Sequence, residues 1–178
     1  MALTKVIGEG LGRSGLPTGT VLQMVHVGNN TVASSNNATY VLYLTAAITP
    51  QFSDSKIILQ HTVSYSGNSN AYGAGKVTRT IAGGTETALR YGNAHFTDNR
   101  FTAASFPMQT ISQGHYKIYN VNFSFQEALS TTAEVTYKCY VIEDAAPTDM
   151  SINRSYANPD DGYNAPSGST IILTEVAG

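Results

Sequence analysis

The sequence has no tryptophan and one cysteine, and only 12% of its 178 residues are charged, about half the usual share of a soluble protein. The single cysteine, Cys139, excludes an intramolecular disulfide and the cysteine spacings of zinc ribbons and redox motifs. The net charge is -2 and the ten basic residues are scattered, so no positive field exists to hold a phosphate backbone. We therefore expect no nucleic-acid partner.

Long apolar runs are also missing. The first ten residues contain no apolar core of a secretory signal, and no segment approaches the length of a membrane span. These observations predict a protein made in the cytoplasm without a membrane partner. Hydrophobic residues nevertheless make up 42% of the chain, which is enough for one ordinary domain with its own core. A surface of hydroxyl and amide groups, filling the space that charge leaves, suits broad contact with other protein.

Residues 1–19 differ in composition from the rest, because five glycines interrupt the apolar side chains there. This pattern predicts a glycine-rich N-terminal arm, lying on its own domain or reaching onto a neighbour, before one domain over residues 20–178. The candidate docking residues of the arm are Leu3, Val6, Ile7, Leu11 and Leu16. Gly10, Gly12 and Gly15 match a dinucleotide fingerprint in spacing, but Pro17 follows where a helix would have to begin. No cofactor is expected.

The stretch from Ile48 to Leu59 organises the predicted fold as strand, corner, strand. Pro50 cannot donate to a sheet ladder and residues 53–55 are polar, so the connection is a surface turn. We expect Phe52 to fold back and plug the end of the core. Residues that alternate on one side of the second strand are Ile57, Leu59, His61, Val63 and Tyr65.

Further strands follow from the same alternation. Residues 20–27 are apolar on both sides apart from Gln23 and His26, which predicts a strand covered on both faces. The glycine-rich stretch 66–75 is expected to be an exposed tip without regular structure. Two alternating runs around residues 82–84, Ala-Gly-Gly, indicate a hairpin.

The second half of the chain adds strands at His115–Phe125, Glu134–Ile142 and Ser169–Val176. One or two short strands are expected within residues 92–113, and another at Met150–Arg154. Helix is nearly absent. About nine or ten short strands in a chain of this size predict an all-β, single-domain antiparallel β-sandwich of jelly-roll type.

Groups for catalysis or metal binding are present but not paired. The histidines are His26, His61, His95 and His115, and the carboxylates considered are Glu86, Glu127, Glu134, Glu143 and Glu175. No two histidines have the spacing that places both imidazoles on one ion, and nothing pairs the carboxylates for glycoside cleavage. Residues 160–162 indicate an ordinary turn rather than a calcium loop. Cys139 is expected to fill the core. We predict no catalytic residue, no metal site and no enzyme.

Eleven tyrosines form the other compositional signal, because tyrosine is favoured at interfaces and in sugar-binding clefts. Tyr72, Tyr91, Tyr156 and Tyr163 lie in or beside loops and are candidate exposed contacts. Tyrosines within strands, such as Tyr140, suit packing or subunit contact.

Four segments together resemble a family of small β-rich virion proteins of tailed bacteriophages, whose members are head-decoration, tail-fibre or virion structural proteins. The segments are Pro17–Val25, Ala47–Ile58, Thr132–Tyr137 and Ser169–Val176. In the family, an opening Pro-x-Gly-x-Val-Leu-Gln leads into the first core strand and the last strand runs to the C-terminus, and both features match here. The resemblance implies a virion component, expected to be a homotrimer, whose partners are copies of itself and the major capsid protein or tail proteins.

Two places on the particle fit this resemblance. Tail fibres usually carry a shaft of coiled coil or repeats, and this chain has neither heptads nor repeats. A capsid decoration or cement protein docking on the head is therefore the preferred interpretation. The alternative is a tail fibre or tail-associated adhesin domain that binds a host-surface glycan.

Overall fold

The computed structural model describes residues 16–35, 39–68, 71–89, 104–110, 117–143, 150–156 and 167–178. Within these ranges the chain forms eleven β-strands and no helix, one strand more than the upper end of the predicted number. The strands are β1 (Val21–Asn29), β2 (Ala33–Ser35), β3 (Val41–Ile48), β4 (Lys56–Gly67), β5 (Tyr72–Ile81), β6 (Thr87–Leu89), β7 (Phe106–Gln109), β8 (Tyr119–Ala128), β9 (Val135–Glu143), β10 (Met150–Ile152) and β11 (Ser169–Val176).

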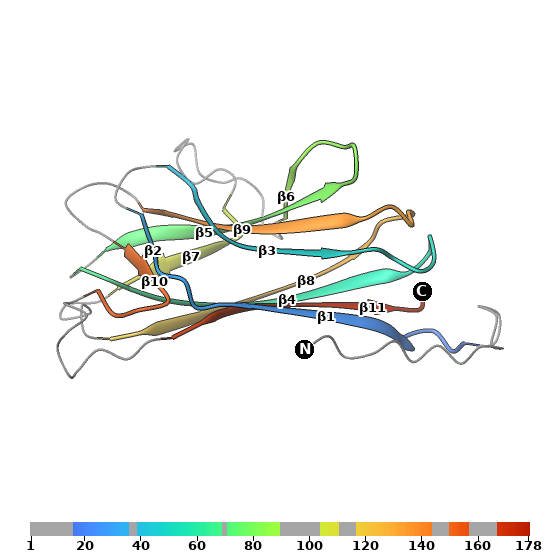
Figure 1. The fold of residues 1–178 in the computed structure, drawn as a ribbon, viewed down its shortest axis with the longest axis horizontal. Helices are drawn as coiled ribbons and strands as arrows, with labels where there is room; N and C mark the ends of the chain where they lie inside the picture. Colours follow the sequence, from blue (N-terminus) through green and yellow to red (C-terminus); the bar gives the residue numbers. More distant parts are fainter. Residues whose placement is uncertain are drawn as a thin grey trace.

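The strands pair into two antiparallel sheets, which lie one above the other as the two layers of a sandwich (Figure 1). Sheet A has the order β1-β11-β4-β10-β2, with β8 on the other side of β4. Sheet B has the order β3-β9-β5-β6, with β7 also paired to β5. The hairpin predicted around residues 82–84 is confirmed as the β5–β6 connection, where Gly83 has a positive φ of 77°.

The order of pairing is that of a jelly roll. If the short strands β2, β6 and β10 are set aside, β1 pairs with β11, β3 with β9, β4 with β8, and β5 with β7. First therefore pairs with last, second with second-last, and so on inward, and successive pairs alternate between the two sheets. Such a pattern results when one long hairpin is rolled up into two Greek keys. The predicted all-β sandwich is confirmed.

Alternation along the strands fills the space between the sheets. Ile57, Leu59, Val63 and Tyr65 of β4 all point inward as predicted, and each is less than 5% exposed. Cys139 of β9 is also fully buried, which confirms its assignment as a core residue. A row of rings crosses the core, in which each neighbouring pair has centroids between 5.7 and 6.2 Å apart. Its members are Tyr43, His61, Phe106, Phe123 and Phe125.

A β-bulge in β3 gives the row its first member. The register of β3 against β9 shifts between Leu42 and Leu44, so Tyr43 and Leu44 are both buried although they are adjacent in sequence. The extra inward position brings the Tyr43 hydroxyl within 2.8 Å of Nε2 of His61 on the opposite sheet. The bulge thereby joins the two sheets through a polar contact inside the core.

The prediction for residues 66–75 is wrong. β4 continues to Gly67 and β5 begins at Tyr72, while Ser66 and Ala71 are fully buried. The glycines make this possible, because a Cβ on Gly75 would collide with the ring of Phe106 at 1.9 Å. Glycine here allows close approach between neighbouring chains rather than an open tip.

Two further expectations also fail. β1 is an edge strand, and Val21 and Met24 are 57% and 54% exposed, so it is not covered on both faces within this chain. The reason is that no described element packs on the outer face of sheet A, and only β11 pairs along the edge of β1. Phe52 is only partly buried and is not part of the core, because the corner is held through its backbone, as described below.

Candidate interaction surfaces

The outer face of sheet A carries a single charged side chain, Lys56 at the start of β4, in the part of the chain that the structure describes. It is formed by the residues that alternate with the inward row on β1, β11, β4 and β8. These residues include Met24, His26, Gly28, Lys56, Ile58, Gln60, Thr62, Ser64, Asn120, Asn122, Ser124, Gln126, Thr170, Ile172 and Thr174. Hydroxyl and amide groups pair across the strands, with Thr62 Oγ1 donating to Asn122 Oδ1 at 2.8 Å. The result is a broad, mostly polar surface with one charge at its end.

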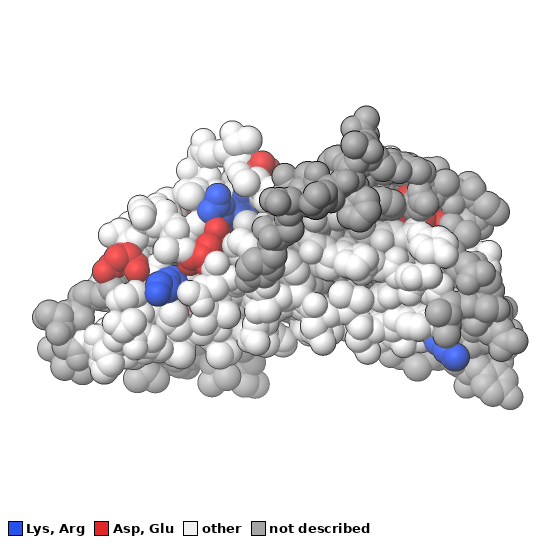
Figure 2. Space-filling view, turned by 180° about the vertical axis from the view of Figure 1, so that it is seen from behind, with Lys and Arg blue, Asp and Glu red and all other residues white. Residues whose placement is uncertain are grey.

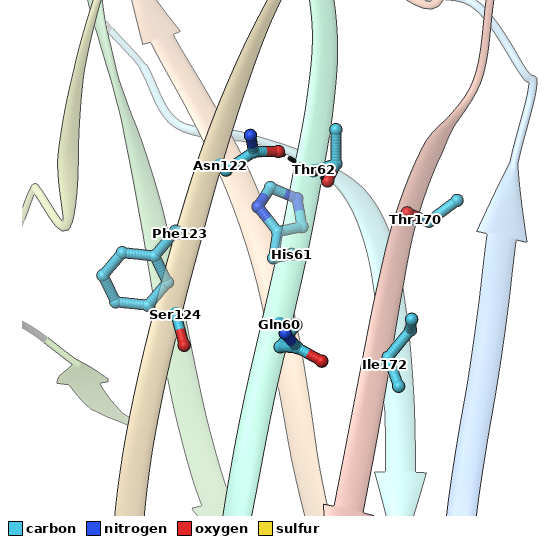
Figure 3. A pocket seen from close by; sticks show the side chains of 8 residues that line it. All are labelled: Gln60, His61, Thr62, Asn122, Phe123, Ser124, Thr170 and Ile172. Atoms are coloured by element: carbon cyan, nitrogen blue, oxygen red, sulfur yellow. Dashed lines mark hydrogen bonds between the residues drawn. The ribbon is translucent and has the colours of Figure 1, made fainter.

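A shallow depression of about 230 Å³ lies on this face. Figure 3 shows that its lining comes from three neighbouring strands, β4, β8 and β11. The side chains that reach it include Gln60, Thr62, Asn122 and Ser124, whereas the ring of His61 turns into the core beside Phe106. Such a lining offers hydrogen bonds to an uncharged polar partner. Its volume is below the range of about 300–1,000 Å³ typical of small-molecule sites.

Sheet B presents a different surface, on which Tyr40, Lys76, Glu86, Lys138 and Tyr140 form what we call the tyrosine cluster. The Lys76 ammonium lies 4.0 Å from the ring centroid of Tyr40 and 4.5 Å from that of Tyr140. Glu86 accepts hydrogen bonds from Lys138 at 3.0 Å and from Tyr140 at 2.9 Å. Each charge of the cluster therefore has a partner within it.

The protonation of the tyrosine cluster follows from these contacts. Burial lowers the pKa of Lys76, and the Glu86 carboxylate opposes that shift. Burial alone would raise the pKa of Glu86, but hydrogen bonds from Lys138 and Tyr140 outweigh it and lower the pKa.

Figure 2 shows that charged side chains on the side seen from behind are few and gather mainly in one patch, and most of the described surface is neutral.

Glu175 of β11 fastens the corner between β3 and β4. Its carboxylate is fully buried and accepts hydrogen bonds from the backbone N–H of Gln51 at 2.7 Å and from the amide of Gln23 at 2.6 Å. Gln23 also donates to the carbonyl of Thr49 at 2.7 Å. The last strand thereby holds the first strand and the corner together. Sequence reasoning treated Glu175 only as a possible catalytic carboxylate and missed this role.

A partly buried carboxylate joins the sheets on the opposite side of the sandwich. Glu127 of β8 accepts a hydrogen bond from Arg79 of β5 at 2.7 Å and another from the hydroxyl of Tyr137 at 2.8 Å. Burial and the neighbouring Glu127 raise the pKa of Tyr137, so its hydroxyl stays protonated and donates. Arg79 and Glu127 therefore form an ion pair between the sheets, and the Tyr137 hydroxyl is hydrogen-bonded to its carboxylate.

The groups considered for catalysis are not brought together. His26 lies on the outer face of sheet A and His61 points into the core, while His95 and His115 lie outside the described residues. Burial lowers the pKa of His61 to about 4 and raises that of Cys139, so neither is an activated base or nucleophile. Within the described ranges, no three His, Cys, Asp or Glu residues lie close enough to hold a metal ion. The same ranges contain no helix suited to spanning a membrane.

The predicted contact residues are only partly accounted for. Tyr72 is 51% exposed, but it is the first residue of β5 rather than part of a loop. Tyr156 follows β10, is partly buried, and its backbone N–H donates to Ser66 Oγ at 2.8 Å. Leu16 is partly buried. The remaining candidates, Tyr91, Tyr163, Leu3, Val6, Ile7 and Leu11, lie outside the described residues.

No protein-family model matches the chain, and no curated protein matches it. Two similar solved structures are those of infectious bursal disease virus, an animal virus, in its Gx and Gt strains. Each is 8% identical and matches over 98% of this chain and 43% of the other, with TM-scores of 0.48 and 0.43. This chain thus spans less than half the length of those chains. At these values the likeness decides nothing about function, and the fold stands on the strand pairing itself.

Proposed function

We propose that this chain is a non-enzymatic structural protein of a virus particle, and that it serves as a capsid decoration or cement protein on the head of a tailed bacteriophage. It assembles as a homotrimer and docks on the major capsid protein. The choice of a phage particle and of a trimer rests on the resemblance of four segments to phage virion proteins. These segments are residues 17–25, 47–58, 132–137 and 169–176.

The observation that carries the proposal is the nearly uncharged outer face of sheet A. Among the described outward positions on its four long strands, Lys56 at the start of β4 is the only Lys, Arg, Asp or Glu. A free-standing protein usually keeps charge on such a face for solubility, whereas a face covered by other protein has no need of it. Docking on a shell would cover a face of this kind.

The N-terminal arm is the proposed anchor. Leu16 and Pro17 begin the described chain, and Gly19 N–H donates to the carbonyl of Ala177 at 2.7 Å, so the arm departs beside the C-terminal end of β11. Apolar residues Leu3, Val6, Ile7 and Leu11 would add contact area at each of three copies, and multivalency would amplify it. Deletion of residues 1–15 should leave a folded oligomer that no longer binds the particle. A truncated protein that still decorates particles normally would contradict the anchor.

The test of the proposed function is the number of copies per particle. Quantitative mass spectrometry of purified virions would compare this protein with the major capsid protein. Near-stoichiometric abundance is the expected result for a decoration or cement protein. A few copies per particle would place it on the tail, and absence from the particle would overturn the proposal.

The alternative, a tail-associated adhesin that binds a host-surface glycan, is favoured by one observation. The depression lined by Gln60, Thr62, Asn122 and Ser124 offers amides and hydroxyls that suit sugar hydroxyl groups. Binding of purified protein to host-surface polysaccharide, compared with an Asn122→Asp variant, would test it. Unchanged binding by the variant, or no binding by either protein, would exclude this depression as a glycan site.

A further inference from the structure

β8 differs from every other edge strand of the sandwich. It pairs with β4 over all ten of its residues without a register shift, and no described strand pairs along its other side. Natural proteins protect free edges with bulges, prolines or very short strands. The edges of β1 and β3 carry bulges, and β6 and β7 are three and four residues long, the latter with Pro107. β8 has none of these features.

The open backbone groups of β8 can be assigned to particular residues. Ser64 of β4 is opposite Asn120, and its N–H and C=O bond to Ser169 and Asn153, which lie away from β8. In an antiparallel pair, the backbone N–H and C=O groups of two opposite residues either both face the partner strand or both face away from it. Because those of Ser64 face away from β8, those of Asn120 face the open edge. By alternation, Asn122, Ser124 and Gln126 face it too, and no hydrogen bond joins their N–H or C=O groups in the described structure.

The side chains along this edge suit a partner without charge. Those on the outer face are amides and one hydroxyl, and those on the inner face, Tyr119, Val121 and Phe125, are only partly buried. The one charged residue of β8, Glu127, is already held by Arg79 and Tyr137. An added strand would cover the apolar row and pair the open backbone groups without burying an unpaired charge.

We propose that this edge pairs with β8 of a second copy, antiparallel and across a two-fold axis at Phe123. In this register Asn120 is opposite the partner's Gln126 and Asn122 is opposite the partner's Ser124. All four outward-facing residues of each strand are then paired, and no like charges meet. Sheet A continues from one copy into the next.

The sequence of β8 favours its own copy over the N-terminal arm as occupant. β8 has the strict alternation and ten-residue length that a continuous ladder needs, whereas the arm has five glycines and no alternation. The contact does not depend on the proposed virion function. The proposed homotrimer would use a three-fold contact elsewhere on the chain. That contact and the β8 contact could then form together, which would give pairs of trimers.

The first test uses Ser124→Pro, with Ser124→Ala as its matched control. Proline removes an N–H that faces the open edge and leaves the bonds to β4 intact, whereas alanine keeps that N–H. Two-fold symmetry removes the donor twice, so we expect proline to weaken the two-copy contact at least about 100-fold relative to alanine. Analytical ultracentrifugation of the full chain measures this, and circular dichroism checks that both variants are folded.

The second test, which holds even if the proline variant fails to fold, uses the single variants Asn122→Cys and Ser124→Cys. These positions face each other across the proposed axis at a distance suited to a disulfide, but each is too far from its own symmetry mate. Mild oxidation should therefore cross-link the two variants when mixed and neither when alone. Cys139 is buried and does not interfere.

The outcomes separate the alternatives. Cross-linking only in the mixture, with loss of association in Ser124→Pro, supports the proposal. A wild-type chain that stays unpaired at high concentration overturns it. Weakened association without the cross-link also overturns it, and assigns the edge to another strand such as the arm. None of these results depends on the copy number in virions.

Discussion

The two long sides of the sandwich are closed in different ways. On the side where β1 and β3 lie together, amide side chains of one sheet reach the backbone of the other: Gln23 donates to the Thr49 carbonyl at 2.7 Å, and Asn29 donates to the Tyr43 carbonyl. On the side of β8, described polar contacts between the sheets are the ion pair of Arg79 and Glu127, to which Tyr137 donates, and the hydrogen bond from Tyr65 to the Gln109 carbonyl at 2.9 Å. The first arrangement uses a carbonyl of the edge strand β3, whereas the second leaves the outward backbone groups of β8 open.

This difference shows how one sandwich can have a protected strand edge on one side and an edge open to strand pairing on the other. The bulges of β1 and β3 interrupt regular ladders, while the side chains of Gln23 and Asn29 donate to the carbonyls of Thr49 and Tyr43. An approaching strand would find few regular partners there. Along β8 the ladder is uninterrupted, so any partner strand would be expected on that side.

The largest effect should come from breaking the closed side at Glu175. Glu175→Ala removes a buried carboxylate that accepts from Gln51 and Gln23, and leaves those donors without their acceptor. We expect a loss of about 3 kcal/mol in the free energy of unfolding. Glu175→Gln, which keeps the shape and one accepting oxygen, should lose roughly half as much. Urea denaturation measures both, and an alanine variant as stable as the wild type would mean that the corner is held by other contacts.

The centre of the core should make stability depend on pH. Burial lowers the pKa of His61 from 6.5 to about 4, so the unfolded chain binds a proton that the folded chain does not. Stability is therefore complete above pH 6.5 and falls as the pH drops toward 4, by about 3 kcal/mol in all. Denaturation at several pH values between 4 and 7 measures the slope.

Two variants isolate this contribution from the titration of carboxylates. His61→Phe removes the titrating ring and should flatten the slope, although Tyr43 loses its partner and the variant starts from a lower stability. His26→Gln changes an exposed histidine on β1 and should leave the slope as it is. Equal slopes in all three proteins would show that His61 titrates normally in the folded chain.

On the β8 side, Tyr137→Phe should cost about 1.5 kcal/mol, because it removes a buried hydroxyl that donates to the Glu127 carboxylate. Tyr140→Phe is a matched control, since its hydroxyl also donates to a carboxylate, that of Glu86, but in an exposed setting. We expect less than about 0.5 kcal/mol for the control. Thermal unfolding compares the two. Similar losses would mean that burial does not strengthen the β8-side contact.

Period-two patterns were sufficient to predict the sandwich. The alternation of Ile57 to Tyr65 and the Ala-Gly-Gly hairpin both describe local geometry, which the residues themselves determine. Glycine in the stretch 66–75 was misread because its role is set by Phe106, a residue distant in sequence. The exposure of β1 was missed because nothing in its apolar residues shows whether another element packs on its outer face.

The interaction surfaces were less predictable for the same reason. Lys76 contacts Tyr40 and Tyr140, and Glu175 contacts Gln51, only after the chain has folded, because their separation in sequence carries no pattern. The strand predicted at His115–Phe125 overlaps β8, which begins at Tyr119 and extends to Ala128, but an open edge is a property of the whole pairing order. Composition alone pointed to surfaces with little charge, and it could not say that the outer face of sheet A would have so little.

The smallest effect should come from the outer face of sheet B, which belongs to neither side. Lys76→Met keeps the length of the side chain and removes the charge that lies over the rings of Tyr40 and Tyr140. Because the site is partly solvated, we expect a loss of about 0.5 kcal/mol. Lys76→Arg keeps a cation able to stack on both rings and should retain nearly all of the stability. The contrary result would be a loss of unfolding free energy in Lys76→Met as large as that in Tyr137→Phe. The tyrosine cluster would then stabilise the sandwich as strongly as the contact of Tyr137 with Glu127, and the contrast between the two sides would not explain where the polar stabilisation lies.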